Sequence, residues 1–175
     1  MATPKNIVLS GVPISPGLAQ GKAFVFRDIM ERVAGSGTIQ PDEVGRECER
    51  IERAIGDVLR DLNSAAEHVE REVDAVMANI FRAHGEMLRD VTFTDEIRAE
   101  IRKDLVNVEH ALRRVFGRWE GRFRSMQSET QRRRGDDIAD LGRRLLRSLA
   151  GIQGHSLAAM PKGSILVARR LLPSD

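Results

Sequence analysis

The feature that most constrains the fold is a long apolar seam between Pro41 and Val69. Its members are spaced alternately by four and three positions, which places them on one face of an α-helix of about eight turns. Pro41 suits the first helical position, and Asp42 and Glu43 suit the positive end of the helix dipole. A helix this long needs partners, and the pattern alone fits either a coiled coil or a bundle. The seam consists of Val44, Cys48, Ile51, Ile55, Val58, Leu62, Ala65 and Val69.

A second helical pattern covers residues 70–90. Its apolar residues recur at helical spacing, so we expect them to share one buried face. We read Cys48 in the first helix as a small buried hydrophobe and His84 in the second as a packed histidine, with a phospho-acceptor role for His84 as the alternative. The predicted face of the second helix is Val73, Val76, Met77, Ile80, Phe81, His84, Met87 and Leu88.

A third pattern runs from Thr94, a candidate N-cap, to Phe123. A break near residues 104–107 would divide it into two helices. A last helix is expected after Gly135, or from an earlier start near Ser125, and Gly151 is its predicted stop. The apolar stripe of the third pattern includes Trp119, which we read as core, and comprises Ile97, Ile101, Leu105, Val108, Leu112, Val115, Trp119 and Phe123.

Short β-type segments flank these helices. Residues 7–12 and 21–26 predict two strands separated by a proline and glycine turn, and residues 164–168 predict a third. The expected fold is therefore mainly α with a small β lobe (α+β). A bundle of four to five helices is inserted between two N-terminal strands and one C-terminal strand, which brings the termini near each other.

Composition excludes several classes of protein. The formal net charge is only +2, so bulk charge does not call for nucleic acid. The single cysteine excludes a disulfide framework or a cysteine metal site. There is no signal peptide pattern and no stretch of the roughly 20 apolar residues that a membrane span needs, so we expect a cytoplasmic protein without a membrane partner.

No catalytic constellation is visible among the residues. The four histidines lack metal-ligand spacing, and the serines and glycines match neither a nucleophile elbow nor a phosphate-binding loop. We therefore assign no catalytic residue, no metal ligand and no cofactor. From these residues alone, the sequence predicts a helical binding module with a small β lobe.

An arginine-rich stretch covers residues 113–134. It indicates either an anionic partner or a solvated basic face balanced by acids of the first helix. Aromatic residues are not interleaved in a nucleic-acid pattern, so a nucleic-acid partner is not expected. The arginines are Arg113, Arg114, Arg118, Arg122, Arg124, Arg132, Arg133 and Arg134, and they face only Glu120 and Glu129.

Several stretches together resemble one family. GVPISPGLAQGKAFVF (11–26), IFRAHGEMLRD (80–90), DDIADLGRRLLRSLAG (136–151) and SILVARRLLPSD (164–175) are similar to the N-terminal region of enzyme I of the phosphoenolpyruvate-dependent sugar phosphotransferase system. Their order and spacing extend the resemblance over nearly the whole chain.

The resemblance implies three parts. Residues 1–38 would begin an α/β phosphohistidine-type lobe, residues 39–151 would form a helical carrier-docking bundle, and residues 152–175 would return to the lobe, which stays incomplete. In this family the bundle docks HPr, the histidine-containing phosphocarrier, and a C-terminal barrel binds phosphoenolpyruvate and Mg²⁺. The family's phosphorylated histidine lies in a Gly-Gly-x-Thr-Ser-His segment that this sequence lacks, so we expect the chain alone to be inactive.

The resemblance places Met87, Phe93, Phe123 and Arg134 on the docking surface, with His84 beside it and Met87 and Phe93 as apolar anchors. Two departures concern charge. Acids that often follow the position of Asp90 are here Val91 and Thr92, and the usual Asp-x-Tyr-Leu-x-Glu-Arg stretch is replaced by residues 129–134, which are rich in arginine. A paralogous carrier, as in nitrogen-related or regulatory branches, is therefore an expected alternative to ordinary HPr.

A second hypothesis is a regulatory or structural helical module that sequesters a phosphocarrier or self-associates. It is motivated by the edge strand and the apolar surface that an incomplete lobe would expose. A third hypothesis, nucleic-acid binding through the arginine-rich stretch, predicts binding that falls steeply with salt.

Overall fold

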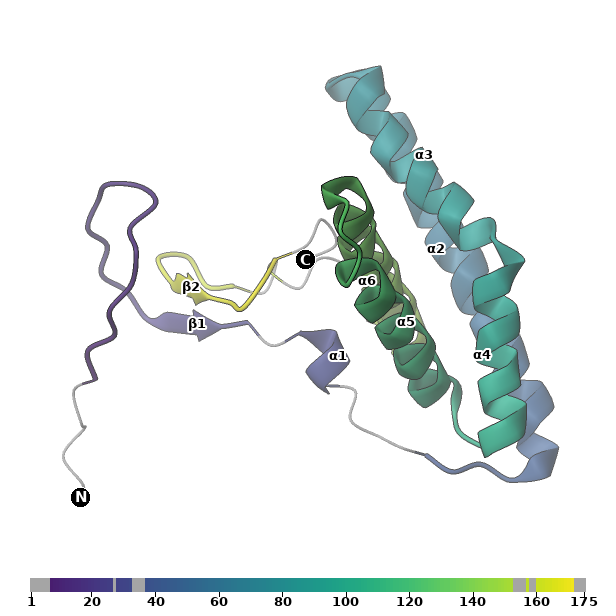
Figure 1. Ribbon diagram of the computed structural model, residues 1–175. Coiled ribbons are helices and arrows are strands. Elements are labelled where there is room, and N and C mark those ends of the chain that lie inside the picture. The colour runs from purple at the N-terminus through teal and green to yellow at the C-terminus, as the bar shows by residue number, and fades with distance from the viewer. Residues whose placement is uncertain (1–6, 27, 33–36, 153–156, 158–159, 172–175) are drawn as a thin grey trace.

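The computed structural model describes residues 7–26, 28–32, 37–152, 157 and 160–171. It confirms a mainly helical fold with a small β lobe: the long helices lie together, and two short strands lie to one side of them (Figure 1). Among the described residues, no helix combines the length and apolar character needed to cross a membrane. The elements are β1 (Ala23–Val25), α1 (Ile29–Arg32), η1 (Pro41–Glu43), α2 (Val44–Glu72), α3 (Ala75–Arg89), α4 (Val91–Asp104), α5 (Val108–Arg124), α6 (Glu129–Leu149) and β2 (Ile165–Val167).

The seam helix is confirmed as α2, and it belongs to a bundle rather than a free coiled coil. Its start is closed by a capping box between Gln40 and Glu43. The seam residues Cys48, Ile51 and Leu62 are buried, and α2 packs mainly against α3 and then α6. Ala54 and Ala66 join the buried face, so the contact surface is wider than the seam itself.

The predicted second helix is wrong at its start and in part of its buried face. Residues 70–72 continue α2, and α3 begins after Asp74, whose carboxylate accepts the Met77 N–H at 2.7 Å. Val76, Met77 and Ile80 are exposed, whereas Ala78, Gly85 and Leu88 are buried. This orientation of α3 turns the larger apolar side chains of its first half outward.

The third pattern divides into α4 and α5, as the expected break near residues 104–107 requires. Leu105 has a left-handed φ of 48°, and the Asn107 side chain accepts the His110 N–H at 3.0 Å to cap α5. The expected Thr94 cap is wrong. Asp90 caps α4 instead, because its carboxylate reaches the Thr92 N–H at 2.9 Å and helical backbone already begins at Val91.

Helix α6 begins at Glu129, earlier than Gly135 and a few residues after the alternative start near Ser125. Gly135 and Gly142 lie inside α6 and permit close packing on α5. A Cβ added at Gly142 would lie only 3.0 Å from the Phe116 ring. The predicted stop is confirmed: Gly151 has φ 65°, and Ile152 N–H donates to the Arg147 carbonyl at 2.9 Å, which closes a Schellman motif.

The β lobe contains one parallel pair among the described residues, with Ala23 opposite Ile165 and Val25 opposite Val167. The expected strand at 7–12 is wrong, because these residues adopt no regular strand and their large apolar side chains are exposed. β-branched residues favour a strand only when a neighbouring strand accepts their backbone hydrogen bonds, and the described residues supply none there. Part of the expected connector, residues 35–36, and the closing residues 172–175 lie outside the described residues.

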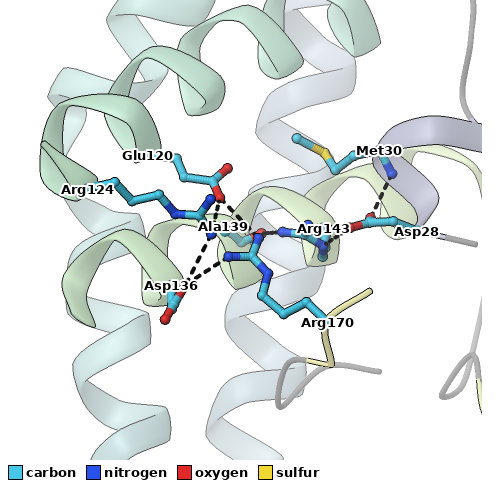
Figure 2. Close-up of polar contacts among 8 residues, drawn as sticks. All are labelled: Asp28, Met30, Glu120, Arg124, Asp136, Ala139, Arg143 and Arg170. Atoms are coloured by element: carbon cyan, nitrogen blue, oxygen red, sulfur yellow. Dashed lines mark hydrogen bonds and ion pairs between the residues drawn. The ribbon is translucent and has the colours of Figure 1, made fainter. Parts of the chain in front are cut away.

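Two sets of ion pairs join the lobe to the bundle (Figure 2). Asp28, which follows β1, accepts from Arg143 Nε of α6 at 2.7 Å, and its other oxygen accepts the Met30 N–H at 2.9 Å. Arg170, which follows β2, donates to Asp136 at 2.8 Å and to Glu120 at 3.0 Å. The lobe is therefore held on the α5–α6 side of the bundle.

We predict that Leu112→Ala lowers the free energy of unfolding by about 2–5 kcal/mol, because it opens a cavity in the core. Leu112 is 0% exposed. The matched control is Leu18→Ala, since Leu18 is fully exposed and its truncation removes no packed contact. Urea unfolding followed by helical circular dichroism measures both; equal losses would contradict the assigned core.

We also predict that Asp28→Asn costs about 1–3 kcal/mol, because it leaves the buried Arg143 guanidinium without its carboxylate. In an Arg143→Met background the same change should cost far less, since no buried cation remains. A double-mutant cycle of unfolding free energies tests this, and simple additivity would show that the pair does not hold the lobe.

Candidate functional site

The ends of four helices converge on one region of the bundle. His84 of α3 lies with Nε2 3.3 Å from Asp137 Oδ1 of α6 and with Nδ1 3.9 Å from Asp140 Oδ2. His84 is 3% exposed, so it is a packed histidine as predicted, and Nδ1 has no hydrogen-bond partner. This contact places the middle of α3 beside the first half of α6.

An aromatic series links α4 to the end of α5 in the same region. The Phe93 ring of α4 lies 5.4 Å from the Phe116 ring and 5.2 Å from the Trp119 ring, and Trp119 lies 6.1 Å from Phe123. Phe93 is only 8% exposed, so it is not an exposed anchor in this structure and instead supports the surface from beneath. Trp119 packs against the core, as the sequence predicted.

The outward face of α3 carries an apolar stripe, here called the α3 stripe: Val76, Ile80, Ala83 and Met87. Spacings of four, three and four align them on one side of the helix. Val76 is 77% and Ile80 47% exposed, while Met87 is partly buried against the core. Exposed apolar side chains aligned on one side of a helix are typical of interaction surfaces, so the α3 stripe is a candidate site.

The sequence pattern identified Met87 but not the exposure of Val76 and Ile80, because it assigned them to the buried face. A signal was present in Ala78 and Gly85. Small residues seven positions apart mark the side of α3 that approaches another helix closely. The side that carries Val76 and Ile80 then stays exposed.

Phe123 and Arg134 complete the region at the α5–α6 end. Phe123 is half-buried, and its Cβ lies near the backbone of Gly135, next to the exposed Arg134. The structure links the predicted site residues in two groups: His84, one turn before Met87 on α3, meets Asp137 of α6, while Phe93 and Phe123 both contact Trp119. Arg134 lies one turn before Asp137 on α6. Among the described residues, no group of three His, Cys, Asp or Glu side chains could hold a metal ion.

The arginine-rich stretch is partly neutralised, though not chiefly by α2 as expected. Arg114 lies 3.1 Å from Glu100, and Arg118 lies 3.2 Å from Glu96, both on α4. The hydrogen bonds to Glu100 and Glu96 raise the pKa of Arg118. These carboxylates belong to α4 because α4 and α5 pack side by side. The periodicity of the sequence did not predict that pairing.

Asp90 sets the junction between α3 and α4, next to Met87. Its carboxylate caps α4, and hydrogen bonds from the Thr92 side chain and the Thr92 backbone lower the pKa of Asp90 below its ordinary value of 3.8. The ionised form therefore stabilises the bend that orients both helices toward the site.

The sequence profile of the family described as PEP-utilising enzyme, N-terminal, matches residues 10–134. Phosphoenolpyruvate-protein phosphotransferase of Priestia megaterium is 30% identical over 95% of this chain, which spans only 29% of that relative. A solved structure titled as Enzyme I (nEIt), determined by NMR in solution, superposes with a TM-score of 0.70 at 25% identity, covering 92% of this chain and 64% of that one. The N-terminal domain of Enzyme 1 - Nitrogen superposes with a TM-score of 0.66 at 21% identity over 89% and 71% of the two chains, which shows a shared fold.

We predict that Asp90→Ala lowers the thermal midpoint at neutral pH and that this difference disappears in acid. Because the folded-state pKa of Asp90 is depressed, its stabilisation is present above about 3.8 and is lost as pH falls through the folded pKa. Asp90→Asn is the control, since an amide oxygen caps the helix at every pH. A midpoint difference between wild type and Asp90→Ala that stays constant from pH 7 into acid would contradict the assignment.

Proposed function

This chain belongs to the family of enzyme I N-terminal domains (PEP-utilising enzyme, N-terminal), and we propose that its bundle docks an HPr-like histidine phosphocarrier. The observation that carries this proposal is the α3 stripe, an aligned and exposed apolar face beside the converging ends of α4, α5 and α6. A partner that covers Val76, Ile80 and Met87 would gain the hydrophobic free energy that the fold leaves unused.

The share of this chain in phosphate transfer is recognition. Within a phosphotransferase of the kind seen in its relatives, phosphate passes from phosphoenolpyruvate to an enzyme histidine and then to the carrier. We assign docking to residues 39–151 and assign residues 1–38 and 152–175 to the phosphohistidine-type lobe. Mg²⁺ chemistry belongs to other parts of such an enzyme and takes no step here.

The proposed docking surface comprises the α3 stripe, Phe123 and Arg134, supported by His84 and Phe93. His84 couples α3 to α6 through Asp137, and Phe93 couples α4 to α5 through Trp119. These buried contacts keep the four helix ends in register before a partner arrives. Preorganisation of this kind reduces the ordering cost of binding.

A second candidate function is self-association, with or without sequestration of a carrier. It is favoured by the exposed apolar side chains of the N-terminal segment, which include Ile7, Val8, Ile14 and Leu18, and by the exposed Val167 of β2. Sedimentation of the isolated chain separates the two functions: a stable dimer that carrier does not dissociate favours self-association, and a monomer excludes it.

We predict that Ile80→Glu weakens binding of an HPr-like carrier at least about tenfold, because it places a charge at the centre of the apolar contact. The matched control is Ile152→Glu beyond α6: Ile152 is 42% exposed and Ile80 is 47% exposed, so both changes should spare the fold. Trp119, the single tryptophan, lies next to Phe123 and reports binding by fluorescence. Equal affinity for both variants would contradict the α3 stripe as the docking surface, and so would an absence of shifts in α3 amides at millimolar carrier.

A further inference from the structure

We infer that the docking surface selects a phosphocarrier whose contact face is acidic around its apolar centre. This inference rests on the proposed function and adds the charge of the partner. It is carried by three arginines at the α5–α6 end, Arg122, Arg132 and Arg134, which we call the arginine rim.

The arginine rim has no carboxylate partner among the described residues. Arg132 donates to the carbonyl oxygens of Met126 and Gln127, at 3.3 and 2.6 Å. The Arg122 guanidinium lies 4.9 Å from the centre of the Trp119 ring, and Arg134 is exposed. These contacts orient two of the guanidinium groups and neutralise none of the three charges.

Three acids near the rim, Asp136, Glu120 and Glu129, already pair with other arginines, and Asp137 lies 3.3 Å from His84 Nε2. Asp136 and Glu120 accept from Arg170 of the lobe and also pair with Arg124, as Figure 2 shows. Glu129 pairs with Arg133 at 2.6 Å. Five arginines and one glutamate lie between residues 122 and 134. Docking of the lobe therefore keeps this end of the bundle positive.

The arginine rim is connected to the α3 stripe through the contact between Asp137 of α6 and His84 of α3. Asp137 touches His84, whose neighbours along α3 include Ala83 and Met87 of the stripe. Arg134 lies one turn before Asp137 on α6, and Arg122 covers the ring that stacks on Phe123. Long arginine side chains at these positions reach the edge of a partner seated on the stripe.

An apolar centre beside unpaired cations fits a folded protein with an acidic edge better than it fits nucleic acid. A nucleic acid would neutralise the arginines but leave Val76 and Ile80 uncovered, and Trp119 is already packed against Phe93 and capped by Arg122. Guanidinium groups pair well with carboxylates, and charges at the rim of an interface act mainly on partner choice and association rate. A carrier with basic residues around its apolar patch would meet like charge here.

The test uses the full chain and two probes: an HPr-like carrier with basic residues around its active histidine, and the same carrier with those residues changed to glutamate. At low ionic strength we expect the acidic probe to bind at least about tenfold more tightly, with the difference shrinking as salt rises. Arg122→Glu/Arg132→Glu/Arg134→Glu should reverse the preference. Arg122→Glu/Arg134→Glu serves as a second variant, because Arg132 holds the α5–α6 turn through Met126 and Gln127.

The matched control carries the same change of charge elsewhere: Arg53→Glu/Arg102→Glu/Lys103→Glu, at exposed positions on α2 and the last turn of α4. It should keep the preference for the acidic probe. Equal binding of both probes, unchanged by the rim variants, overturns this inference and leaves carrier docking standing. Binding of neither probe overturns both. Retention on heparin that requires the arginine rim, together with no binding of either probe, assigns the rim to nucleic acid instead.

Discussion

The structure depends first on burial of the α2 face between α3 and α6. Ile51, Val58 and Leu62 are almost completely buried, and they supply the long apolar surface on which the other helices assemble. An isolated helix of this length would expose that surface to water, so α2 is stable only as part of the bundle. The apolar side of α2 is buried inside the bundle, whereas α3 keeps exposed apolar side chains.

Close approach of the remaining helices decides where that spare surface lies. Ala78 and Gly85 lie on the buried side of α3, and Gly135 and Gly142 let α6 pack tightly on α5. Because Ala78, His84 and Leu88 occupy the inner side of α3, Val76 and Ile80 lie on the outer side. The same packing rule therefore stabilises the bundle and creates the α3 stripe.

Charge is organised by the same tertiary contacts. Arginines in the first part of the arginine-rich stretch meet carboxylates of α4, and Arg170 of the lobe engages Glu120 and Asp136. Arg122, Arg132 and Arg134, at the α5–α6 end, have no carboxylate partner among the described residues. The sequence shows that arginine outnumbers glutamate between residues 113 and 134. Only the ion pairs of the folded chain show which of these arginines lack a carboxylate partner.

Local rules in the sequence determined much of this protein. The 3.6-residue periodicity located α2 and the helical pattern of α4 and α5, Gly151 ended α6, and short apolar runs predicted β1 and β2. The resemblance places Met87, Phe123 and Arg134 at one surface, and this shared docking surface stays a prediction. The structure pairs His84 of α3 with Asp137 of α6 and stacks Trp119 on Phe123 within α5. The tertiary structure alone decided three matters: Ile7–Val12 form no strand without a partner, Phe93 is buried, and Val76 and Ile80 face outward. Periodicity shows that a helix has an apolar side, whereas the size of neighbouring side chains and the position of the next helix decide which side is covered.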